Sequence, residues 1–133
     1  MIRISIDGAA GLVTHMGSGA VSIGEIEAAF EARLENPDFR PGMKVLWDCR
    51  EASISTLSAD GIRRLIGFND GYKDARGDGT SAIVVSGDLD YGIGRMFQAY
   101  ADDLPWETVV FRDLNSAIQW LSDPDGGRTS EPV

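Results

Sequence analysis

The side chains best suited to chemistry are concentrated in one short stretch near the middle of the chain. There an apolar run is followed by a carboxylate, a thiol, a guanidinium and several hydroxyl groups, including Asp48, Cys49, Arg50, Ser53 and Ser58. In open α/β sheets, ligands bind at the carboxyl ends of the strands. We therefore take the end of this predicted strand as the first candidate site.

A second polar group follows the next buried strand. Asp88, Tyr91 and Arg95 fall at the start of a predicted helix. Neighbouring parallel strands should bring them close to Asp48, Arg50 and Ser58. Arg95 and Tyr91 suit an anion or a partner's carboxylate, and a solvated arginine packed on Tyr91 explains the pair equally well.

Ser58 has two interpretations. At a helix N-terminus, a phosphoserine would be stabilised by the helix dipole and the free N–H groups, which suits a phosphorylation switch. Serine is also one of the commonest N-cap residues, so a simple cap is the simpler interpretation of Ser58.

No complete catalytic, metal or cofactor signature is present. Cys49 would need His15, the only histidine, and a buried structural cysteine is the simpler interpretation. One Cys and one His do not make a zinc site. Gly92 and Gly94 resemble a dinucleotide fingerprint, but Phe97 occupies the third glycine position. We therefore predict a non-enzymatic protein without a metal or cofactor.

The elements that must position these residues follow from periodicity and end signals. Alternating or buried apolar runs predict strands over 2–7, 12–16, 43–47, 81–85 and 106–111. Apolar residues at helical spacing predict helices over 23–36, 59–76, 88–104 and 114–121. The order ββαβαβαβα predicts one α/β sandwich with a mostly parallel sheet. It spans 1–122 as a single domain, and 123–133 is a predicted disordered tail.

The second predicted helix contains three glycines, Gly61, Gly67 and Gly71. Each costs about 1 kcal/mol relative to alanine in a helix interior. Close packing against another backbone would explain them, and so would a ligand groove or a movable helix.

Composition limits the partners. The net charge is −9, with 21 acidic and 12 basic residues, which disfavours nucleic acid and anionic lipid surfaces. No apolar run approaches the roughly 20 residues of a membrane span. The single cysteine and the absence of a secretory apolar core predict a cytoplasmic protein. Monomer and homodimer both stay open, with the exposed edge of the first hairpin as a surface on which two copies could pair.

Several segments together resemble the bacterial SpoIIAA-like proteins, which share the STAS and Sec14-like fold. The resemblance covers about residues 2–121 and is carried by 11–14, 45–48, 95–100, 110–114 and 120–121. In STAS anti-sigma-factor antagonists, a serine at the start of the helix after the third strand is phosphorylated and switches partner binding. Ser58 is the closest positional match, but the segment 56–61 departs from their Asp-Ser-Ser-Gly type of motif.

The resemblance and the lack of a catalytic set predict a regulatory or protein-binding module. It would engage a protein partner through the surface formed by Asp48, Arg50, Ser53, Ser58, Asp88, Tyr91 and Arg95, with a phosphorylation switch at Ser58. The alternative is a carrier or sensor of a small apolar or amphipathic ligand held between sheet and helices. Glycines in the second helix and aromatic residues such as Trp47, Phe68, Phe97 and Tyr100 favour this alternative.

Overall fold

The computed structural model describes residues 1–123 and contains one five-stranded sheet. The strands are β1 (Ile2–Asp7), β2 (Leu12–Ala20), β3 (Lys44–Ser53), β4 (Ser81–Val84) and β5 (Thr108–Phe111). The helices are α1 (Ile23–Glu35), α2 (Ala59–Gly71), α3 (Lys73–Arg76), α4 (Asp88–Tyr100), the 3₁₀ turn η1 (Ala101–Asp103) and α5 (Leu114–Leu121).

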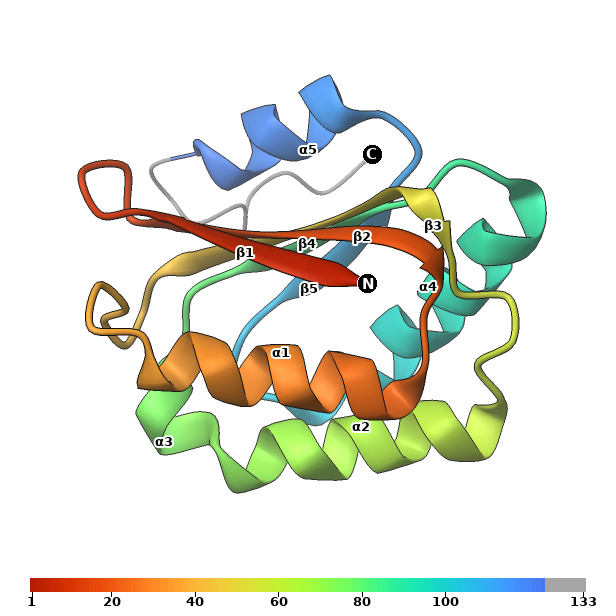
Figure 1. Ribbon diagram of the computed structural model, residues 1–133, viewed down its shortest axis with the longest axis horizontal. Helices are drawn as coiled ribbons and strands as arrows, with labels where there is room; N and C mark the ends of the chain where they lie inside the picture. The colour runs from red at the N-terminus through yellow and green to blue at the C-terminus, as the bar shows by residue number, and fades with distance from the viewer. Residues whose placement is uncertain (124–133) are drawn as a thin grey trace.

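The strands lie in sequence order across the sheet. β1 and β2 form an antiparallel hairpin, and β2 to β5 are parallel neighbours. Right-handed crossovers between successive parallel strands place their helices on one face. Figure 1 shows α1, α2 and α4 on that face and α5 on the opposite face. The predicted α/β sandwich with a mostly parallel sheet is confirmed.

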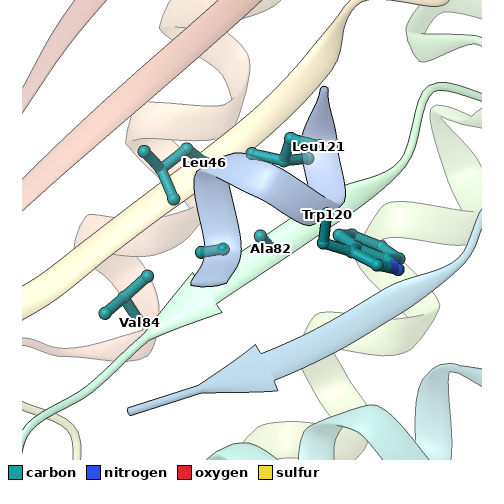
Figure 2. Packing of buried hydrophobic residues seen from close by; sticks show 6 residues of the cluster. Leu46, Ala82, Val84, Trp120 and Leu121 are labelled. Atoms are coloured by element: carbon teal, nitrogen blue, oxygen red, sulfur yellow. The ribbon is translucent and has the colours of Figure 1, made fainter. Parts of the chain in front are cut away.

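Each face has its own apolar core. Under α5 the buried residues are Leu46, Ala82, Val84, Ala117, Trp120 and Leu121 (Figure 2). Under α1, α2 and α4, a second core contains Cys49, Ile62, Val85 and Val110. The alternation of side chains along β3 and β4 divides them between the two cores. Ile118 of α5 lies outside both cores and is 42% exposed.

The third strand is longer than predicted. The apolar run ends at Trp47, but β3 continues to Ser53 because β2 extends to Ala20 and pairs with it along this length. Asp48, Arg50 and Ser53 are therefore strand residues rather than loop residues.

Two helices are shorter than predicted. α2 ends at Gly71, and Tyr72 leaves the helical conformation before the short α3. The Tyr72 hydroxyl donates to Glu31, and its ring packs on Phe30 and Phe68. α4 ends at Tyr100 rather than at residue 104. The helix starts at Ser22, Ser58 and Asp113 are confirmed, with each side chain accepting a backbone N–H.

Among residues 1–123, no helix is both long and apolar enough to cross a membrane. The predicted tail at 123–133 lies, apart from Asp123, outside the described residues.

Candidate functional site

The predicted strand-end residues fall into three local groups. Asp48 and Arg50 form the first, on β3. The Arg50 guanidinium donates Nε to Oδ1 and Nη2 to Oδ2 of Asp48, both at 2.9 Å. These charged hydrogen bonds hold the pKa of the Asp48 carboxyl below its usual range. The carboxylate is thus already occupied by its neighbour.

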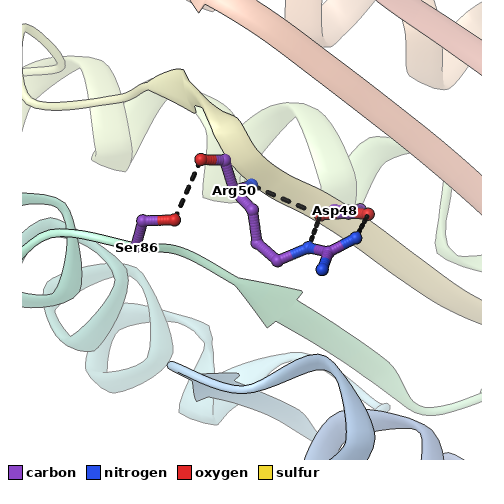
Figure 3. A network of polar contacts seen from close by, with 3 residues as sticks. All are labelled: Asp48, Arg50 and Ser86. Atoms are coloured by element: carbon purple, nitrogen blue, oxygen red, sulfur yellow. Dashed lines mark hydrogen bonds and ion pairs between the residues drawn. The ribbon is translucent and has the colours of Figure 1, made fainter.

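Ser86, which follows β4, connects the segment after this strand to β3. Its hydroxyl donates to the Arg50 backbone carbonyl at 2.9 Å, and Figure 3 shows Arg50 between Asp48 and Ser86. Sequence reasoning did not single out Ser86. The signal in the sequence that could have identified Ser86 was its position directly after a buried strand, next to the polar residues that follow the neighbouring apolar run.

The second group lies at the start of α4. Asp88 pairs with Arg112 at 2.6 Å, and the Arg112 guanidinium stacks over the Tyr91 ring at 4.3 Å. Arg95 donates to the Tyr91 hydroxyl at 3.4 Å. Arg112, which follows β5, was not predicted. Its position after the last strand was the only signal in the sequence.

The third group spans the end of β3 and the loop before α2. Ser53 and Ser55 share a hydrogen bond of 2.9 Å, and Ser58 caps α2 by accepting the Gly61 N–H at 3.0 Å. Within residues 1–123, no hydrogen bond or ion pair joins Ser58 to the other two groups.

The residues considered for catalysis are buried. Burial, with smaller contributions from Asp48 and Asp90, raises the pKa of Cys49 to about 12, so its thiol stays protonated at neutral pH. His15 stacks on Trp47 with ring centroids 3.9 Å apart. Neither nitrogen of His15 has a hydrogen-bond partner within the described chain, so no hydrogen bond links it to Cys49 or Ser58. In the same range, no three His, Cys, Asp or Glu residues gather as metal ligands.

A cavity of about 70 Å³ lies between the sheet and helices α1, α2 and α4. Most of its lining is apolar, including Trp47 from β3, Phe97 from α4 and Trp106 before β5. Its polar lining includes Arg33 and Arg76, which are each 1% exposed.

These two arginines were missed by sequence reasoning. Arg33 falls three residues after Phe30 on the inward stripe of α1, and a charge on an apolar stripe was the available signal. Nothing in the sequence marks Arg76, which lies in the final turn before Gly77.

The α2 glycines separate into two kinds. A Cβ on Gly61 would lie 3.1 Å from Ile23, so close packing accounts for that position. A Cβ on Gly67 or Gly71 would meet no atom of the described residues within 4 Å. Packing therefore explains only the first of the three.

Comparison with known proteins identifies the fold. No family model and no curated protein matches the sequence. The structure has a SpoIIAA-like fold, as the sequence predicted. It is similar to the crystal structure of an uncharacterised DUF3478-family protein from Shewanella loihica PV-4, with 19% identity, 91% of this chain and 92% of that chain covered, and a TM-score of 0.55. At this identity the likeness shows the fold alone.

Proposed function

We propose that this protein is a non-enzymatic binding module that carries or senses a small amphipathic ligand held between the sheet and helices α1, α2 and α4. The observation that carries the proposal is the cavity itself, which combines an apolar lining with a few buried polar groups, as ligand sites do.

The covering helix supports this function. α2 forms part of the cavity wall through Ile62, Leu65 and Phe68, and it contains two glycines with no packing contact. Each of these glycines lowers the intrinsic stability of the helix by about 1 kcal/mol relative to alanine. A weakened wall provides a route by which a ligand enters.

Two tryptophans in the lining give a direct test. Titration with 1-alkanols should change the fluorescence of Trp47 and Trp106. Native mass spectrometry of protein purified gently from its host should also show an extra mass that dissociates from the chain, as a bound ligand would. Ile83→Phe, which fills the cavity from β4, should remove the response, whereas Leu114→Phe on the α5 face should keep it. A bare chain that responds to no apolar compound would contradict the proposal.

A second candidate is a phosphorylation-switched protein-binding module, which the exposed Ser58 at the start of the 13-residue α2 favours. Ser58→Asp should change the proteins captured by the immobilised chain, and Ser58→Ala should not. Ser22 caps α1, also of 13 residues, so Ser22→Asp is the matched control. Identical capture by wild type, Ser58→Asp and Ser22→Asp would remove this candidate.

A further inference from the structure

Arg33 is a buried cation with no counter-ion among the described residues 1–123. The residue is 1% exposed, and its Nε and Nη1 find no hydrogen-bond acceptor within residues 1–123. No described carboxylate lies within ion-pair distance of Arg33. Its close contacts are the rings of Phe30 at 4.3 Å and Phe39 at 5.9 Å. Ring faces attract a cation but do not accept its N–H groups in good geometry, so Arg33 retains unused donors.

Arg76 is a second buried cation on the same cavity, but it has a structural role. Its guanidinium lies 3.8 Å from the Trp106 ring, and Nη1 donates to the carbonyl oxygens of Gly77 and Gly79. Burial, and then repulsion from Arg33, lowers the pKa of Arg76 to about 9. Both guanidinium groups belong to residues that line the same cavity, so their positive charges repel one another.

Buried charges are normally paired, because an uncompensated charge in an apolar interior is strongly destabilising. Here, in contrast, two buried side chains of the same charge, those of Arg33 and Arg76, face one apolar cavity. An anion in the cavity would accept the free Arg33 donors and would relieve the repulsion between Arg33 and Arg76. Thr108 also lines the cavity. Its buried hydroxyl has no hydrogen-bond partner within residues 1–123 and provides a further donor.

We propose that the cavity binds an organic carboxylate with an apolar body, whose acid group pairs with the free donors of Arg33 and faces Arg76. This inference rests on the proposed ligand-binding function and specifies the class of ligand. A guanidinium fork matches the two oxygens of a carboxylate. A singly charged acid is favoured over a phosphate ester because the second charge of the ester raises the cost of transfer into an apolar cavity.

The size of the cavity limits the apolar body. One buried water needs roughly 10–15 Å³. The cavity of about 70 Å³ therefore accepts a compact acid without rearrangement. Longer acids would require α2 to move outward. Affinities measured along a series of acids of increasing chain length should show the length at which this movement becomes necessary.

The test compares straight-chain carboxylates, from butanoate to decanoate, with the matched 1-alkanols, using tryptophan fluorescence and thermal unfolding. We expect each carboxylate to bind at least about 10-fold more tightly than its alcohol, which is the effect of a charged hydrogen bond. Arg33→Met should lose this preference and still bind the alcohols. Arg64→Met is the control, since Arg64 pairs with Glu27 at the surface.

The outcomes separate the two proposals. Equal affinity of the wild type for acids and alcohols, or an unchanged preference in Arg33→Met, would overturn the carboxylate assignment and leave the cavity function standing. Failure of both series to bind would overturn the proposed function as well. Arg33→Lys, which keeps the charge but not the fork, should retain a reduced preference, and it serves if Arg33→Met does not fold.

Discussion

At the scale of single residues, the informative positions are buried polar side chains that have no hydrogen-bond partner among residues 1–123. Arg33 and His15 both have unused hydrogen-bonding groups in an apolar interior, and such groups cost stability. Burial, followed by repulsion from Arg33, lowers the pKa of His15 to about 2. The histidine is therefore neutral in the folded protein across the physiological range and charges only when the chain unfolds.

This shift predicts acid sensitivity. The pKa of His15 is lower in the folded chain than its ordinary 6.5, so between pH 6.5 and 2 the unfolded state binds more protons. Stability should fall as pH drops through 6.5, by about 2 kcal/mol at pH 5. Urea unfolding at pH 7.5 and pH 5 measures this loss.

The matched variant is His15→Phe, which keeps an aromatic ring against Trp47 and removes the titration. Because the chain has one histidine, His15→Phe should show a much smaller loss between these pH values. An equal loss in wild type and variant would contradict the assignment.

At the scale of elements, α2 and α4 have glycines with opposite roles. Gly67 in α2 has open space around its Cβ position. A Cβ on Gly94 in α4 would lie 2.5 Å from Val110 Cγ2, so glycine permits α4 to approach β5 closely. Both helices have 13 residues, which makes the same substitution comparable in each.

Alanine at these two positions should act in opposite directions. Gly67→Ala should stabilise the protein by up to about 1 kcal/mol, because it lowers the cost of forming α2. Gly94→Ala should destabilise it by about 1–3 kcal/mol through overpacking. Chemical unfolding measures both changes. In stopped-flow fluorescence, Gly67→Ala should also slow ligand entry if α2 opens, and an unchanged entry rate would exclude α2 as the route.

At the scale of the whole molecule, the excess of acidic residues sets the long-range electrostatics. The net charge is −9, and ion pairs such as Arg63–Asp60 and Arg112–Asp88 lie at the surface, where each contributes little. Mutual repulsion of the acidic groups should therefore outweigh the surface pairs. The buried Arg33 and Arg76 are shielded from salt by the surrounding protein.

Salt should therefore stabilise the fold. Raising NaCl from about 0.01 M to about 0.1 M shortens the screening length from about 30 to about 10 Å. The thermal midpoint should rise by a few degrees, which for a chain of this size corresponds to about 1 kcal/mol. If charge screening is the cause, choline chloride should raise the thermal midpoint by the same amount as NaCl. A falling midpoint would mean that the surface ion pairs dominate.

The resemblance of several segments to the SpoIIAA-like proteins predicted the particular fold. The amino-acid sequence by itself determined the α/β class, the order of the main elements and the starts of α1, α2, α4 and α5. These depend on local patterns: the period-two alternation of the first strand, the serine and aspartate caps, and the apolar runs of the central strands. It also placed Ser58, Asp88 and Tyr91 at helix starts, because cap and stripe signals are local. It placed Asp48 and Arg50 after the end of a strand, whereas they lie inside β3.

Only the tertiary structure decided which side chains meet. The Asp88–Arg112 pair depends on the approach of two elements distant in sequence, and the extension of β3 to Ser53 depends on the length of its partner β2. Above all, the cavity and its two cations arise where α1, α2, α4 and the sheet pack together. No local pattern encodes that space, because burial and pairing of a side chain are properties of the neighbours that folding brings to it.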